Sequence, residues 1–167
     1  MSIENSRWVG VMRNIGVFDF MVNALSGINS TNMMTDAFKA FAYGSPKFAI
    51  WGLGMNDGSD ADAQTPKPAW LTAITSFINL CKEKNTIPIL ATIPCVPTIN
   101  HEGKNAWVKA SGYRYIDFAK AVNGDTYTSG VNNWYDGMLS SDNVHPTSIG
   151  AQALAAQVMV DFPEIMQ

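Results

Sequence analysis

Apolar runs of strand length alternate along this chain with segments of helical periodicity, and this alternation limits the fold more than any other feature. The run KFAIWGLG at 47–54 is almost continuously apolar, which is typical of a strand buried on both faces of a sheet. Further strands are expected at 18–25, 86–94 and 113–119. Strands separated by helices form parallel sheets through right-handed crossovers. The sequence therefore predicts an α/β fold whose parallel sheet is covered by helices on both faces.

Four segments carry apolar residues at helical spacing, and polar loops join them to the predicted strands. In open parallel sheets, functional residues lie in the loops at the carboxyl ends of the strands. The first helical segment contains Trp8, Val11, Met12 and Ile15, and the second places Met34, Phe38 and Phe41 on one face and ends at Gly44. The third begins near Thr65 and buries Leu71, Ile74, Ile78 and Cys81, and the last follows Pro146 and buries Ala151, Leu154, Ala155 and Val158.

Length and composition describe one compact domain over residues 1–167. Hydrophobic residues make up 47% of the chain and charged residues 15%, a balance that argues against a disordered protein. A net charge of −3 gives no basic surface, so we expect no nucleic-acid partner. No apolar run approaches the length of a membrane span, and two cysteines cannot form a disulfide framework.

The stretch LSSDNVHPTSIG at 139–150 places an aspartate three residues before one of the two histidines. A histidine acts as a general base when a carboxylate fixes its tautomer and the orientation of its ring. The spacing allows Asp142 to reach Nδ1 of His145, and Pro146 holds the junction between the loop and the last helix. The alternative is that Asp142 only caps the helix and His145 is an incidental polar residue. The motif alone leaves both interpretations open.

Two further polar positions follow predicted strands. Asn56, in GMNDGSD, is able to donate a side-chain N–H to a developing oxyanion, or to close a local Asx-turn in its own loop. Gly27, in ALSGINS, offers a backbone N–H, although a glycine in a loop after a strand needs no functional reason. We expect Gly27, Asn56 and the Asp142–His145 loop to lie at the same edge of the sheet.

The segments LSGINS, GMND and SSDNVHP occur in the order, and at roughly the spacing, of the later three sequence blocks of the SGNH hydrolases, the GDSL-like esterases and lipases. The resemblance covers the chain from Ser2 onward. It implies a three-layer α/β/α, flavodoxin-like fold and hydrolysis of esters by a Ser–Asp–His triad. By the same resemblance, Asp142 orients the base His145, while Gly27 and Asn56 form the oxyanion hole. No cofactor or metal is implied.

The first block of that family, a strand that ends in Gly-Asp-Ser, is missing from this sequence. The resemblance aligns Ser2 with the nucleophile, with Met1 in the place of the aspartate. In the flavodoxin-like strand order the first strand lies inside the sheet, and each unpaired buried backbone group costs about 1–3 kcal/mol. We therefore expect another polypeptide, a second copy of the chain or a rearranged sheet to fill this position, the chain being N-terminally incomplete.

Other candidate residues have weaker claims. Ser26 and Ser59 lie in loops at the expected edge, Ser140 and Ser141 lie very close in sequence to Asp142, and none stands in a Gly-x-Ser-x-Gly elbow. The second histidine, His101, is interpreted as a loop residue, because the histidines and carboxylates lack metal-ligand spacing.

The leading functional hypothesis is a serine ester hydrolase that acts on a short acyl ester or a carbohydrate ester. Trp134 and Tyr135 precede the histidine loop and are candidates to stack on a sugar ring, although aromatic residues at such places more often pack. No extended apolar lid is apparent, which favours a small substrate over a long-chain lipid. The alternative is a non-catalytic relative that binds carbohydrate or ester, or one part of a split enzyme.

Overall fold

The protein divides into two compact units, each formed by segments that are distant in the sequence. In the computed structural model, unit 1 consists of residues 1–21, 94–98 and 116–167, and unit 2 of residues 22–93 and 99–115. The structure describes residues 8–14, 27–42, 44–125 and 133–166.

Unit 2 contains the parallel pair of strands. The strand β1 (Phe48–Trp51) pairs in parallel with β2 (Ile87–Ala91), and Phe48 lies opposite Ile87. Between them the chain forms the 3-10 helix η2 (Met55–Asp57) and then α3 (Pro68–Glu83). This strand–helix–strand connection is the crossover that the alternating pattern predicts, and it confirms an α/β fold with a parallel sheet.

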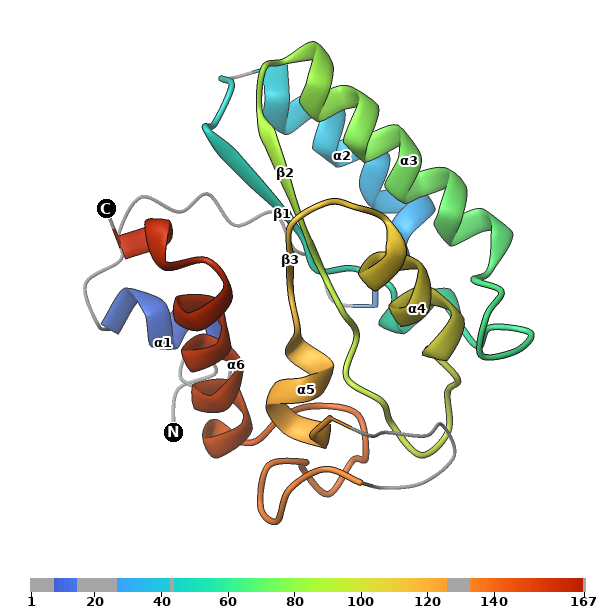
Figure 1. Ribbon diagram of the computed structural model, residues 1–167, viewed down its shortest axis with the longest axis vertical. Helices are drawn as coiled ribbons and strands as arrows, with labels where there is room; N and C mark the ends of the chain where they lie inside the picture. The colour runs from blue at the N-terminus through green and yellow to red at the C-terminus, as the bar shows by residue number, and fades with distance from the viewer. Residues whose placement is uncertain (1–7, 15–26, 43, 126–132, 167) are drawn as a thin grey trace. The chain divides into compact units, whose positions relative to one another are not determined.

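Helices α2 (Ser30–Ala42) and α3 run side by side in unit 2, as Figure 1 shows. The apolar core joins them to the sheet through Met34 and Phe41 of α2, Trp51 of β1 and the buried face of α3. Trp70 is fully buried at the start of α3, and its indole N–H donates to the Leu53 carbonyl at 3.0 Å. The loop that follows β1 is therefore attached to the first turn of α3.

The remainder of unit 2 returns to the sheet through α4 (Glu102–Ala110). The strand β3 (Tyr115–Ile116) then extends the sheet to the order β1-β2-β3. The backbone N–H of Leu90 donates to the Arg114 carbonyl at 3.0 Å, next to this strand. The boundary between the two units falls within β3.

Unit 1 is built on α6 (Ser148–Asp161), which packs against both α1 (Trp8–Asn14) and α5 (Phe118–Asn123). Thr147 caps α6 by accepting a hydrogen bond from the Gly150 N–H at 3.2 Å. The chain ends beyond α6 in the 3-10 helix η3 (Pro163–Met166). The buried residues of α6 include the four expected from the sequence, namely Ala151, Leu154, Ala155 and Val158.

Several expectations need correction. The strand predicted at 113–119 has only two residues, because the Asp117 side chain accepts the Lys120 N–H and begins α5 instead. Phe38 does not share the buried face of α2, since 52% of its surface is exposed. Three of the four residues of β1 are only partly buried, so this strand is not enclosed on both faces. The predicted strand 18–25 lies outside the described residues.

Within the described part of the chain, no helix combines the length and the apolar character needed to cross a membrane.

Candidate active site

In unit 1, the loop before α6 brings a carboxylate onto the ring of His145. The distance from Asp142 Oδ2 to His145 Nδ1 is 2.8 Å. The second oxygen, Oδ1, accepts the backbone N–H groups of Val144 and His145 at 2.8 and 2.9 Å, and the Ser140 hydroxyl at 2.6 Å. The pair is therefore held by the whole loop rather than by one contact.

The local backbone explains why this short sequence forms such a loop. Asn143 adopts a positive φ of 60°, which asparagine tolerates better than most residues. The Ser140 N–H donates to the His145 carbonyl at 2.9 Å, and Leu139 and Pro146 form an isolated antiparallel bridge. Because Thr147 caps α6, the alternative in which Asp142 serves only as the helix cap does not describe this structure.

The hydrogen bonds around Asp142 also fix its charge. The backbone N–H of His145, the Ser140 hydroxyl, the N–H of Val144 and the His145 ring hold the pKa of Asp142 well below its usual range. An ionised carboxylate only accepts hydrogen bonds, so the proton of a neutral His145 ring belongs on Nδ1. The lone pair then lies on Nε2, on a side chain whose relative exposure is 76%. A ring in this state is able to take a proton from a hydroxyl group.

In unit 2, Asn56 is the middle residue of η2, and side chains from elsewhere in unit 2 contact both of its neighbours. Its side-chain N–H donates to the Ile28 carbonyl at 3.1 Å, across 28 residues of sequence, and not back into its own loop. Asn56 is exposed, whereas its neighbour Asp57 is buried. An amide nitrogen carries two hydrogens, and the second N–H of Asn56 has no partner among the residues that the structure describes.

Two glycines with positive φ lie next to the two segments that this hydrogen bond joins. Gly27 has φ of 71° and directly precedes Ile28, the residue that Asn56 binds. Gly54 has φ of 146°, and a side chain there would collide with Ile93 and Trp70. The structure therefore brings the Gly27 turn and Asn56 together, two of the three positions that the sequence analysis expected at one edge of the sheet.

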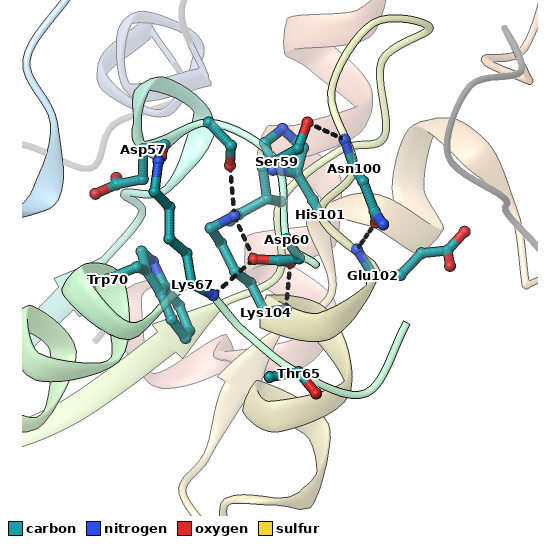
Figure 2. A network of polar contacts seen from close by, with 12 residues as sticks. Asp57, Ser59, Asp60, Thr65, Lys67, Trp70, Asn100, His101, Glu102 and Lys104 are labelled. Atoms are coloured by element: carbon teal, nitrogen blue, oxygen red, sulfur yellow. Dashed lines mark hydrogen bonds and ion pairs between the residues drawn. The ribbon is translucent and has the colours of Figure 1, made fainter. Parts of the chain in front are cut away.

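A buried ion pair holds the loop that follows Asn56. Lys104 and Asp60 have fully buried side chains, and Lys104 Nζ lies 2.7 Å from Asp60 Oδ1. The same ammonium donates to the Gly58 carbonyl at 2.8 Å. Asp60 also accepts the backbone N–H groups of Lys104 at 2.8 Å and Lys67 at 2.9 Å, so one carboxylate joins the starts of α3 and α4 (Figure 2).

Further contacts complete this network (Figure 2). Lys67 Nζ donates to the Asp57 carbonyl at 2.5 Å, and the Asn100 N–H donates to the Ser59 hydroxyl at 3.1 Å. Gly103 lies so close to the Thr65 backbone that no larger residue fits without a shift. The η2 loop is thus held by Lys67, Asn100 and Lys104 in addition to its contact with the Gly27 turn.

His101, at the end of the loop before α4, is a buried part of this network. It is fully buried at the N-cap of α4, and its Nε2 lies 3.2 Å from the sulfur of Met55, the residue before Asn56. Its Nδ1 is buried without a hydrogen-bond partner among the described residues. Burial, together with the nearby Lys104 charge, lowers the pKa of His101 to about 4, against the opposing effect of Asp60. His101 is therefore neutral at physiological pH.

The remaining candidates differ in placement. Trp134 is buried, and its indole N–H donates to the Cys95 carbonyl at 2.5 Å. Its ring therefore packs inside unit 1, and the prediction that it stacks on a sugar is wrong. Tyr135 is 53% exposed, so stacking of its ring on a sugar stays a prediction. Ser2 and Ser26 lie outside the described residues. Over the ranges that the structure describes, no group of three or more histidine, cysteine or acidic side chains is arranged to hold a metal ion.

Comparison with solved structures identifies the fold. A G-D-S-L family protein from Desulfitobacterium hafniense is similar with a TM-score of 0.75 and 16% identity, over 95% of this chain and 89% of that one. The psychrotrophic esterase EstA from Pseudoalteromonas sp. is similar with a TM-score of 0.67 and 14% identity, over 97% of this chain and 88% of that one. A carbohydrate esterase family 3 protein from Talaromyces cellulolyticus is similar with a TM-score of 0.60 and 17% identity, over 84% of this chain and 69% of that one. No family model and no curated protein sequence matches. The chain thus has the α/β fold of GDSL-type proteins that its motifs resemble.

We expect Lys104→Met to destabilise the protein strongly, because it leaves the Asp60 carboxylate buried without its cation. Removing one partner of a buried pair costs about 3–5 kcal/mol, which urea denaturation measures as a lower midpoint. Lys39→Met is the matched control, since Lys39 pairs with Asp36 at 3.3 Å on the exposed face of α2 and such pairs contribute about 0–1 kcal/mol. Equal midpoints for the two variants contradict the assigned role of Lys104.

We expect the free energy of unfolding to decrease as the pH falls from 6.5 to about 4, because His101 binds a proton in the unfolded chain but not in the folded one. The loss approaches about 3 kcal/mol, at 1.36 kcal/mol per unit of pKa difference. His101→Gln should flatten this part of the stability profile. The lowered pKa values of Asp62 and Asp142 affect stability mainly near and below their ordinary value of 3.8, at the lower end of this window. A variant with the wild-type slope would show that another group titrates.

Proposed function

We propose that this protein is a serine ester hydrolase of the SGNH type. The observation that carries the proposal is the 2.8 Å contact between Asp142 Oδ2 and His145 Nδ1, with the rest of the loop holding the carboxylate ionised. A general base requires this arrangement: one ring nitrogen fixed by a carboxylate and the other exposed.

The chemistry follows the usual course of acyl transfer. The serine hydroxyl attacks the ester carbonyl while Nε2 of His145 takes its proton, and a tetrahedral oxyanion forms. The imidazolium, stabilised by Asp142, then returns the proton to the leaving alcohol as the C–O bond breaks. Water hydrolyses the acyl-enzyme by the same two steps, and the serine is regenerated. We assign the nucleophile to Ser2, which aligns with the first block of the family.

Asn56 and Gly27 are the proposed oxyanion donors. Asn56 uses one side-chain N–H to bind the Ile28 carbonyl and keeps the other for the substrate oxygen. Donors of this kind act best when they are fixed before the reaction begins. The Lys67, Lys104 and Asp60 contacts supply such rigidity to the loop that carries Asn56.

The fold supports the same chemistry. EstA and the carbohydrate esterase family 3 protein share this fold with our chain, and both act on esters by name. We propose a short acyl ester or a carbohydrate ester as the substrate, with the exposed ring of Tyr135 as a candidate contact for a sugar. Faster turnover of long-chain esters than of acetyl esters would count against this choice.

One observation favours a second candidate. The sequence contains no Gly-Asp-Ser segment, the usual site of the nucleophile in this family. The second candidate is therefore a non-catalytic relative that uses the same residues to bind a carbohydrate or an ester, or one part of a split enzyme. Binding of an acetylated sugar without turnover would favour it.

We expect His145→Ala to abolish nearly all hydrolysis of p-nitrophenyl acetate while the thermal unfolding temperature changes little, because the exposed ring contributes little to packing.

Asn56→Ala should lower kcat about 100- to 1,000-fold with KM nearly unchanged, since the oxyanion forms only in the transition state.

Ser141→Ala is the matched control for both variants. Ser141 is exposed in the loop of His145 and is assigned no role in the reaction, so removal of its hydroxyl should leave kcat unchanged. Unaltered esterase activity in His145→Ala would refute the assignment of the base.

A further inference from the structure

Asp57, next to the proposed oxyanion donor, directs its carboxylate at a segment 27 residues earlier in the sequence. The backbone N–H of Ser30 lies 3.2 and 3.1 Å from the two carboxylate oxygens. The Ser30 hydroxyl donates to Oδ2 at 2.7 Å. Both residues are buried: Ser30 is fully enclosed and Asp57 is 8% exposed. Neither residue has a place in the catalytic steps proposed above.

The contact joins the two segments that carry the oxyanion donors. Ser30 begins α2, three residues after Gly27, and Asp57 directly follows Asn56 in η2. Asn56 itself binds Ile28, in the middle of the same turn, at 3.1 Å. Two adjacent residues of η2 thus hold the turn between Gly27 and Ser30. The position of the Gly27 N–H relative to the Asn56 amide therefore depends on these contacts.

The contact is not needed to cap α2. Asn29 already fills that role, because its side chain accepts the Asn32 N–H at 2.9 Å. Asp57 instead adds a buried carboxylate at the positive end of the helix, where a negative charge is favourable. Hydrogen bonds to a charged group are stronger than neutral ones, so this link resists opening.

Asp57 is also fixed from its backbone. Its N–H donates to the Gly54 carbonyl at 3.2 Å, and its own carbonyl accepts Lys67 Nζ at 2.5 Å. With the main chain of Asp57 held in this way, its carboxylate is able to transmit the position of η2 to the Gly27 turn. Asn56, the exposed residue beside it, is the group whose position matters for the reaction.

We propose that Asp57, acting through Ser30, is a positioning residue for the oxyanion hole, one that sets the distance between the Gly27 N–H and the Asn56 amide. This inference deepens the proposed function and rests on it. Asp57 does not touch the substrate. Its removal therefore weakens the stabilisation of the tetrahedral oxyanion without weakening the binding of the ester.

The test is a double-mutant cycle on the full chain with p-nitrophenyl acetate as the substrate. We expect Ser30→Ala to lower kcat several-fold and Asp57→Asn to lower it about 10- to 100-fold, with KM nearly unchanged in both. In the Asn56→Ala background the same substitutions should have a much smaller effect, because one of the two donors they position is already gone.

Ser76→Ala is the matched control, because it removes a hydroxyl that donates to the Thr72 carbonyl at 2.9 Å within α3, away from the Asn56 loop. Its kcat should equal that of the wild type. Ser30→Ala removes one hydroxyl only and serves as the readout if Asp57→Asn fails to fold.

The outcomes separate the two proposals. Ester turnover in the wild type, with kcat unchanged in Ser30→Ala and Asp57→Asn, overturns the positioning role and leaves the hydrolase intact. Equal losses of kcat with and without Asn56 overturn it as well, since they indicate a general structural effect. Absence of turnover in the wild type overturns the hydrolase and with it the positioning role.

Discussion

The buried Asp60 carboxylate is the constraint on which the organisation of unit 2 around Asn56 depends. It accepts hydrogen bonds from Lys104 Nζ and from the backbone N–H groups of Lys104 and Lys67. A buried charge is costly unless its partners satisfy it completely, so the loop between β1 and α3 has little freedom to adopt another path. This loop carries η2, and η2 carries Asn56. An exposed amide is therefore supported by buried charges that fix its backbone, as its proposed role in stabilising an oxyanion requires.

The two groups of proposed catalytic residues are built in different ways. The Asp142–His145 pair is local: a separation of three residues, a positive φ at Asn143 and four hydrogen bonds to the Asp142 carboxylate define it within a single loop. The proposed oxyanion donors are not local, since Asn56 reaches Ile28 across 28 residues, and its neighbour Asp57 reaches Ser30 across 27 residues. The local pair depends on the loop sequence alone, whereas the donors depend on the fold of unit 2. In the proposed mechanism, substitutions far from Asn56 are therefore expected to act mainly through the positions of Asn56 and Gly27.

The same difference explains what the sequence could predict. The α/β class, the buried residues of α6 and the Asp142–His145 pair follow from periodicity and short spacing, and the structure agrees with them. The resemblance to SGNH hydrolases led to the fold that the solved structures share. The role of His101 was missed, because its burial depends on Met55, Lys104 and Asp60, which are distant in the sequence. The helix α5 was missed because Asp117 caps a new helix where the apolar pattern favoured a longer strand. Trp134 and Phe38 were misjudged for a related reason: the sequence pattern does not tell which aromatic ring tertiary packing will cover.

If His145 activates a serine for attack on an ester, as we propose, covalent labelling should identify that serine. The full chain is treated with a fluorophosphonate, which reacts with activated serines, and the adduct is located by peptide mass spectrometry. We expect a single adduct on Ser2 that His145→Ala does not form. Absence of any adduct on the wild-type protein, or equal labelling of the wild type and His145→Ala, would contradict it.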